Sequence, residues 1–302
     1  MLVTLGAAPA PPPATVPAVP GLVIVNPSSG KDETSPDELS ALFPGADVTE
    51  SRPDHVEDQI AEARDEGRDW VGVAGGDGTI RSAAEVLAGG DVPLLAIPGG
   101  TLNHFARSLG IDDLEVAAEA ARTGVVERVD VGAVNGRIFV NNSSVGLYAQ
   151  LVLGREARSG RLPKRLADVA AAWEQLRRGH RVLVTIDGEP FRAWMVFVGN
   201  GRYGTGIRDL ASRDDLEDHV LDARVVRGDR RFARLRVAGS LLVGGLDRSQ
   251  LVDCQERSQL DVNLNRSTVE VALDGEVITL EPPLHYESRA AALPVLVPPP
   301  RA

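Results

Sequence analysis

Short apolar runs alternate with helix-patterned segments through the first part of the chain. The runs 21–25, 71–74 and 92–97 are almost continuously apolar, and each ends abruptly in a polar or glycine-rich turn. Continuous apolar runs of this length are typical of parallel strands that are buried on both faces. Because they alternate with amphipathic helices, we expect a doubly wound α/β domain over residues 21–124.

Several of the helical segments in this part carry recognisable ends. Ser35 followed by Pro36 suits an N-cap and the first helical position. Gly67 suits a helix C-terminus. Thr101 is expected to cap a helix that runs to about Leu109. The expected helices are 35–43, 54–67, 80–87, 101–109 and 113–122, with a further strand at 46–50.

Beyond residue 124 the pattern changes to short strands joined by turn pairs. Asn135-Gly136, Asp187-Gly188 and Asp274-Gly275 each separate two strand-like runs, which is a strong hairpin signal. We therefore expect an antiparallel β-sandwich over residues 125–298, with a final strand that returns to the first domain. Helical patterns at 163–178 and 230–243 interrupt it. The other strands expected are 181–186, 191–198, 220–226, 259–263, 268–273, 276–280 and a short one in the tail.

Composition narrows the classes of function. A formal net charge of −11 argues against nucleic-acid binding. The single cysteine, Cys254, excludes an internal disulfide framework and suits a reducing compartment. No apolar run approaches the roughly 18–20 residues that span a bilayer. Residues 1–20 are rich in Ala and Pro and lack a basic start, so we expect a disordered extension.

Three strand ends in the first domain carry polar turns: NPSSG at 26–30, GGDGT at 75–79 and PGGT at 98–101. Ligands of parallel sheets bind at the carboxyl ends of the strands. A strand, glycine turn and helix in succession place backbone N–H groups and a helix N-terminus beside an anion. We therefore expect these turns to bind the phosphates of a nucleotide. The expected contacts are Asn26, Ser28, Gly75, Gly76, Asp77, Gly78, Thr79, Gly100, Thr101 and Asn103.

Asp77 needs a separate explanation, because a carboxylate repels phosphate. Its presence is explained if it binds Mg²⁺, which bridges phosphate oxygens, or if it orients the accepting hydroxyl. The turn has no Walker lysine, so it is not a P-loop. A tight strand–helix connection without a ligand is the structural alternative.

Six segments in this order resemble the diacylglycerol kinase catalytic-domain family, which also holds sphingosine kinases and bacterial YegS-like lipid kinases. The resemblance runs from about Gly21 to Pro298. It implies a nucleotide-binding α/β domain, a C-terminal β-sandwich, an active site in the cleft between them, and the use of ATP and Mg²⁺. The matching segments are NPSSG at 26–30, GGDGT at 75–79, GGTLNHFARSLGI at 99–111, NNSSVG at 141–146, DDLEDHVLD at 214–222 and LDGE at 273–276.

The resemblance also implies roles for residues outside the glycine turns. Glu276 would be the base that accepts the proton of the lipid hydroxyl, with Asp274 nearby as a second catalytic carboxylate. Thr49 would contact the nucleotide. The metal ligands would be Asp215, Asp218 and Val220. The local alternatives are an ordinary hairpin turn for LDGE and an ordinary strand end for Thr49.

This chain departs from the family pattern at three places. His104 stands where the family's GTxND has aspartate, and His219 replaces a glycine of the metal-binding loop. Leu147-Tyr148 follows NNSSVG, where many members have an acidic residue. The loss of carboxylates would weaken magnesium binding or alter the acceptor. Packing or helix capping by His104 is the alternative to a new general base.

One basic segment runs against the acidic average. Residues 155–181 hold eight Lys and Arg against three acids. A basic amphipathic helix docks on an anionic membrane surface, although a solvated face of a core helix has the same pattern. We expect a cytoplasmic enzyme, peripheral to the inner face of the membrane, with the oligomeric state open and a homodimer as one outcome.

Together these features predict a Mg²⁺-dependent lipid kinase of phospholipid metabolism. It would transfer the γ-phosphoryl group of ATP to diacylglycerol or a related lipid alcohol. One alternative is a non-catalytic nucleotide or lipid sensor of the same fold. Another is a soluble-substrate kinase related to NAD kinases, which share a GGDGT turn.

Overall fold

We describe a computed structural model of the chain over residues 21–26, 35–51, 55–146, 182–186, 188–203, 216–228 and 252–299. Some sequence-based predictions fall outside these residues. They are the extension 1–20, Ser28, the pair Leu147-Tyr148, the basic segment 155–181, the helical segments 163–178 and 230–243, and Asp215.

A parallel sheet forms the N-terminal part of the molecule, as the apolar runs predict. Its strands are β1 (Leu22–Val25), β2 (Asp47–Glu50), β3 (Val71–Gly75) and β4 (Leu94–Pro98), and they lie in the order β4-β3-β1-β2. Every residue of β3 is buried, and nearly every residue of β1 and β4 is too. These strands are apolar throughout because both of their faces are covered.

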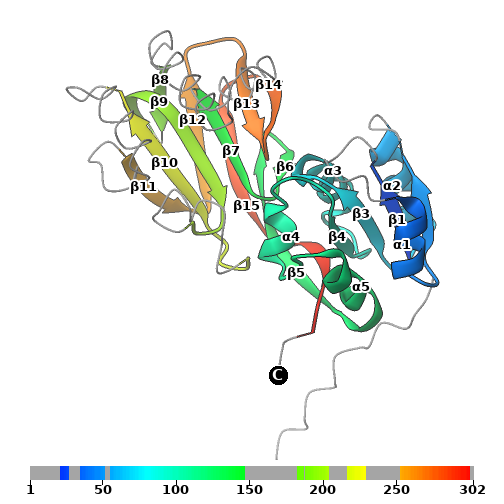
Figure 1. Cartoon of the computed structure of the whole chain (residues 1–302). Helices are drawn as coiled ribbons and strands as arrows, with labels where there is room; N and C mark the ends of the chain where they lie inside the picture. The colour runs from blue at the N-terminus through cyan, green and yellow to red at the C-terminus, as the bar shows by residue number, and fades with distance from the viewer. Residues whose placement is uncertain are drawn as a thin grey trace, which may run out of the picture.

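Helices follow the strands in alternation (Figure 1). Helix α1 contacts α5, whereas α2 contacts α3. This pairing is that of a sheet with helices on both faces, and it confirms the expected doubly wound arrangement. The helices are α1 (Pro36–Leu42), α2 (Val56–Asp65), α3 (Asp77–Leu87), α4 (His104–Ser108) and α5 (Leu114–Thr123).

The helix ends follow the capping signals with one exception. Ser35 accepts a hydrogen bond from the backbone N–H of Glu38 and caps α1, with Pro36 at the first position. Gly67, just after α2, has the positive φ of a C-terminal glycine. The expected N-cap Thr101 is wrong, because α4 begins at His104 and Asn103 occupies the cap position.

The C-terminal part is a set of antiparallel strands, also as expected. The hairpin turns at Asn135-Gly136 and Asp274-Gly275 have positive φ at both residues, which a type I′ turn requires. The paired strands follow the order β14-β13-β7-β9-β8-β12-β15, where β15 is Leu284–Val297, with β10 and β11 continuing from β9. Their bounds are β6 (Arg137–Phe139), β7 (Asn142–Gly146), β8 (Val182–Ile186), β9 (Glu189–Asn200), β10 (Leu221–Arg227), β11 (Val252–Arg257), β12 (Gln259–Leu264), β13 (Val269–Leu273) and β14 (Glu276–Leu280).

Two long strands connect the two parts. The first half of β15 (Leu284–Val297) pairs with β12, and its second half pairs with β4. Strand β5 (Val125–Val134) pairs with both halves of β15. In Figure 1 the red strand β15 runs from the sandwich into the N-terminal part. Leu293 and Val295 of β15 therefore belong to the N-terminal core, whereas Tyr286 belongs to the C-terminal core. The domain bounds stated above stay a prediction.

Within the described ranges, no helix combines the length and the apolar composition that crossing a membrane requires.

Candidate active site

The GGDGT and PGGT turns lie backbone to backbone. A Cβ on Gly99 would come within 2.9 Å of the backbone nitrogen of Gly75, and one on Gly100 within 2.6 Å of the Cα of Gly76. Real Cβ atoms do not approach backbone so closely, so the PGGT turn needs glycine at both positions to make this contact. The structure thus joins two of the three predicted turns at the ends of adjacent strands.

The end of β1 is hydrogen-bonded to the GGDGT turn. The side-chain amide of Asn26 donates to Oγ1 of Thr79 at 3.0 Å, across 53 residues of sequence. Asn26 itself is held by its backbone N–H, which donates to the carbonyl of Ala74. Thr49 lies in β2 opposite Ile24, with β1 between it and β3.

One of the two carboxylate oxygens of Asp77, the first residue of α3, accepts hydrogen bonds. Its Oδ1 accepts hydrogen bonds from the backbone N–H of Phe105 at 3.1 Å and from the side-chain amide of Asn141 at 3.3 Å. No described residue donates a hydrogen bond to Oδ2. One oxygen therefore fixes the position of the side chain, and the other is left for a cation or a hydroxyl group. A carboxylate oxygen without a described hydrogen-bond donor is the kind of ligand that Mg²⁺ takes, so Oδ2 fits the expected role of Asp77.

Asn103 shapes its own turn. Its side-chain oxygen accepts from the backbone N–H of Gly100 at 2.8 Å, and its side-chain nitrogen donates to the carbonyl of the same residue at 3.0 Å. Asn103 also adopts a left-handed backbone conformation, with φ of 51°. Thr101 and Leu102 are exposed on this turn. Asn103 thus positions the turn that faces GGDGT.

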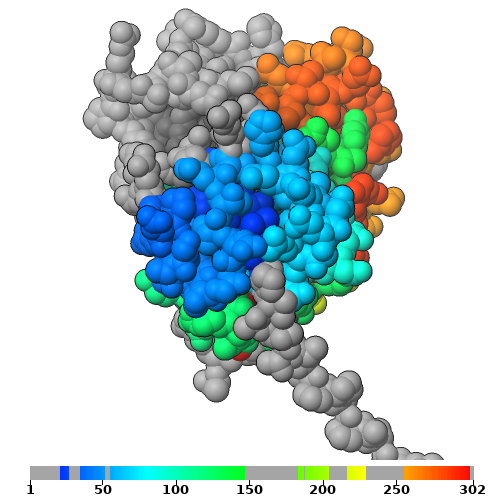
Figure 2. Space-filling view, turned by 90° about the vertical axis from the view of Figure 1, so that its right-hand side faces the viewer, coloured from blue at the N-terminus to red at the C-terminus, as the bar shows by residue number. Residues whose placement is uncertain are grey.

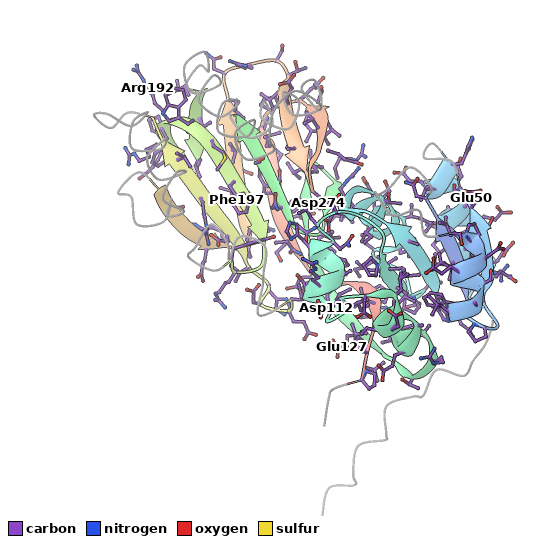
Figure 3. The ribbon with its side chains drawn as sticks, viewed as in Figure 1. Glu50, Asp112, Glu127, Arg192, Phe197 and Asp274 are labelled. Carbon is purple, nitrogen blue, oxygen red and sulfur yellow. The ribbon has the colours of Figure 1, made fainter. Side chains whose placement is uncertain are left out.

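The side chain of Asp274 binds the backbone of a neighbouring segment, residues 140–142. The two oxygens of its carboxylate accept hydrogen bonds from three successive N–H groups, those of Val140 at 2.7 Å and of Asn141 and Asn142 at 2.8 Å. Enclosure of this carboxylate raises its pKa to about 6, although the three donors and Arg81 favour the ionised form. In Figure 3, Asp274 lies where the sandwich strands meet the helices, far from Glu50 at the end of β2.

Glu276, on the same hairpin, reaches the GGDGT turn. Its Oε2 accepts from Nη2 of Arg81 at 2.7 Å, and its Oε1 lies so close to Gly78 that a Cβ there would come within 2.3 Å. Its side chain is 52% exposed. Figure 2 shows the orange surface of the C-terminal strands beside the cyan surface of α3 on this side of the molecule. The LDGE hairpin and the GGDGT turn therefore meet.

Asn141 connects these groups, although no sequence pattern assigns it a role. Its side chain donates to Asp77, its backbone N–H donates to Asp274, and its carbonyl accepts from the hydroxyl of Tyr203 at 2.6 Å and from the N–H of Asn200 at 2.9 Å. Asn141 is buried. The only signal in the sequence is the polar run NNSS between apolar strands, since buried polar residues must be hydrogen-bonded.

The expected metal-binding loop is closed by backbone contacts. Asp218 accepts from the N–H groups of Arg202 at 2.9 Å and Val220 at 3.1 Å, one at each oxygen. His219 has a φ of 55°, a conformation that favours glycine, and Asp130 binds both its N–H and its ring nitrogen. No group of three or more His, Cys, Asp or Glu residues suited to a metal ion is found in the part of the chain that we describe. The ligand set Asp215, Asp218 and Val220 stays a prediction.

The sequence matches two family models that together cover most of the chain. Residues 20–134 match the diacylglycerol kinase catalytic domain, and residues 146–297 match the YegS C-terminal NAD kinase beta sandwich-like domain. The chain belongs to the diacylglycerol kinase catalytic-domain family. It is therefore a kinase of the diacylglycerol kinase-like lipid kinase family, and the resemblance seen in the sequence is confirmed.

Individual members of the family are moderately similar to this chain. A diacylglycerol kinase of Bacillus subtilis is 30% identical over 218 residues, which cover 69% of this chain and 71% of that protein. A probable lipid kinase YegS-like of Pseudomonas savastanoi pv. phaseolicola is 31% identical over 258 residues, 79% of each chain. The crystal structure of a putative diacylglycerol kinase from Bacillus anthracis str. Sterne superposes with a TM-score of 0.70 at 24% identity, covering 93% of this chain and 97% of that one. This last likeness shows the shared fold.

Proposed function

We propose that this family member transfers the γ-phosphoryl group of ATP to the hydroxyl of diacylglycerol or a closely related lipid alcohol, with Mg²⁺. The observation that carries the proposal is the meeting of the two motifs. Glu276 lies against Gly78 of the glycine turn, one residue from Asp77. A carboxylate base beside a phosphate-binding turn is the arrangement that phosphoryl transfer to an alcohol needs.

The residues divide the reaction between them. Backbone N–H groups of the GGDGT turn and the start of α3 bind the phosphates. The free oxygen of Asp77 would hold Mg²⁺, which would supply positive charge to the phosphate oxygens. Oε1 of Glu276 would accept the proton of the lipid hydroxyl while the oxygen of that hydroxyl forms a bond to the γ-phosphorus. The bond from that phosphorus to the β–γ bridging oxygen breaks, and ADP leaves with the electron pair.

The lipid must also reach this site from a membrane. The basic segment 155–181 is the proposed contact with an anionic membrane surface at the inner face of the cell membrane. This contact lies outside the described residues. Vesicles with and without anionic lipid would test it by co-sedimentation with the protein.

Transfer of labelled phosphate from ATP to a panel of lipid alcohols tests the proposal. We expect labelled lipid with diacylglycerol or a relative, none without divalent cation, and about 100-fold less with Glu276→Gln, because a positioned base contributes about 10²–10⁴-fold. Folded protein that labels no lipid alcohol would contradict it.

A non-catalytic role is the second candidate, and His104 is the observation that favours it. His104 is the first residue of α4, where the family motif has an aspartate. A sensor would bind ATP tightly without turnover, and His104→Asp would not restore turnover. A third candidate is a soluble-substrate kinase related to NAD kinases. It would transfer labelled phosphate from ATP to NAD.

A further inference from the structure

Arg81 is a buried cation between the two parts of the molecule. It lies in α3 and is only 4% exposed. Its Nη2 donates to Oε2 of Glu276 at 2.7 Å, and its Nη1 donates to Oε2 of Glu85 at 3.0 Å. One guanidinium group thus links the helix that begins at the phosphate turn with the hairpin that carries the proposed base.

The position of Arg81 on α3 follows from helix geometry. Asp77, Arg81 and Glu85 are spaced four residues apart, so they lie along one face of the helix. At the far end of this face, Glu85 also accepts from Nη2 of Arg137 in β6 at 3.2 Å. Arg81 is therefore held from one side by Glu85 and holds Glu276 on the other.

A gain in the folding stability of the protein does not explain why Arg81 is buried. A buried cation loses its hydration, and replacing a buried ion pair by apolar residues is often neutral or stabilising. Its Nε is also buried, with no hydrogen-bond partner among the residues we describe. Desolvation lowers the pKa of Arg81, but Glu276 and Glu85 more than offset this effect, and the net pKa is raised. The group stays charged, and what it contributes is the placement of its partner.

The two oxygens of Glu276 have different surroundings. Oε2 is bound by Arg81, whereas Oε1 lies over Gly78 in the phosphate turn. Because the side chain of Glu276 is half exposed, it would otherwise sample several rotamers. A contact at one oxygen selects the rotamer in which the other oxygen faces the turn.

We infer that Arg81 is a positioning residue, which holds Oε2 of Glu276 so that Oε1 stays over Gly78 as the proton acceptor. This inference rests on the proposed kinase function and deepens it. Arg81 acts through Glu276, since both of its terminal nitrogens face carboxylates. Displacing a reacting group by about 1 Å costs on the order of 100-fold in rate.

Kinetics of four variants of the full chain test the inference: Arg81→Gln, Arg81→Lys, Glu276→Gln and the double variant of Arg81→Gln with Glu276→Gln. We expect Arg81→Gln to lower kcat about 100-fold, with unchanged ATP affinity measured by calorimetry. Arg81→Lys should lie between it and wild type. The double variant should be no slower than Glu276→Gln alone, because residues that act as a unit are not additive.

Arg137→Gln is the matched control. It removes a second arginine that binds Glu85 but has no hydrogen bond or ion pair with Glu276, so the kcat of this variant should stay close to wild type. A wild-type kcat in Arg81→Gln, or a double variant slowed by the product of the two single effects, overturns the inference and leaves the kinase function standing. If Arg81→Gln does not fold, Arg81→Lys decides: a lowered kcat with unchanged ATP affinity supports the inference, and a wild-type kcat overturns it. No lipid phosphorylation by wild type removes the proposed function and the inference with it.

Discussion

Glu276 lies against Gly78, although 198 positions separate them in the numbering of the sequence. A Cβ built on Gly78 would come within 2.3 Å of Oε1 of Glu276 and within 2.9 Å of its Cδ. The contact is with the far end of a flexible side chain, so a larger residue at position 78 would move the carboxylate and not the backbone. This makes Gly78 a sensitive place to test the proposed base.

Gly78→Ala should lower kcat at least about tenfold, because it displaces the acceptor oxygen from the turn. The melting temperature should change little. Gly72→Ala in β3 is the contrast, since its Cβ would lie 3.0 Å from Cδ1 of Ile97 and 3.1 Å from the ring of Trp70 in the core. That variant should melt earlier but keep a normal kcat per folded molecule. Equal kcat in Gly78→Ala and wild type would argue against a role for Oε1.

Asp77→Asn should abolish most of the activity while the fold is kept. An amide oxygen can still accept from Phe105, but the charge proposed to bind Mg²⁺ is lost. We expect kcat to fall on the order of 100-fold or more in the lipid assay. The control is Asp113→Asn, which replaces the N-cap of α5 by an equally good cap. An Asp77→Asn enzyme with near wild-type turnover would contradict the metal role.

Asp274→Ala should destabilise the protein more than it alters the chemistry. The change leaves the N–H groups of Val140, Asn141 and Asn142 without their acceptor, and each unsatisfied buried donor costs about 1–3 kcal/mol. Urea unfolding would measure the loss. Asp261→Ala is the matched control, because the exposed pair of Asp261 with His285 contributes at most about 1 kcal/mol. Similar losses in the two variants would contradict an anchoring role for Asp274.

The stability should also depend on pH through Asp274. Enclosure raises its pKa from 3.8 to about 6, so between these values the folded state holds a proton that the unfolded state has lost. The stabilisation from this group is therefore fully present below about pH 4 and is lost as the pH rises to about 6. Asp274→Asn does not titrate, so wild type should lose stability relative to it over this range. A stability difference between wild type and Asp274→Asn that stays constant over this pH range would contradict the raised pKa of Asp274.

Asn26→Ala should weaken nucleotide binding selectively. Asn26 joins the end of β1 to Thr79 in the first turn of α3, and its removal loosens the phosphate turn without touching Glu276. We expect the KM for ATP to rise several-fold, since one hydrogen bond contributes about 0.5–1.5 kcal/mol, while kcat at saturation changes less. A fall in kcat with an unaltered KM would place Asn26 in the chemical step.

Much of the framework could be predicted from local patterns. Continuous apolar runs predicted the buried strands β1, β3 and β4, and the Asn-Gly and Asp-Gly pairs predicted two hairpins whose turns have the required positive φ. These features depend on neighbours a few residues away, so the chain encodes them locally. The order of the motifs was also enough for the family, which the comparisons confirm.

Some elements were missed because their patterns are weak. Strand β11 was not expected, since VDCQER is mostly polar, and β15 was expected only as a short strand in the tail. The pairing of β15 with β12 and β5 stabilises its polar first half, and no local pattern reports such a pairing. The start of α4 was misplaced because Asn103, and not Thr101, reaches the cap position through a left-handed backbone.

The arrangement of the site needed contacts between distant segments. Local patterns identified Asp77, Asp274 and Glu276 as acidic residues in turns, with no information on which oxygen of each is already bonded. Folding sets these differences: Asp274 is enclosed by three backbone donors, Asp77 keeps one oxygen without a described donor, and Glu276 is bound by Arg81 from a helix 195 positions away. Hydrogen bonds and burial act through space, so the strands that bring the two parts together decide which oxygens of the three carboxylates are already bonded.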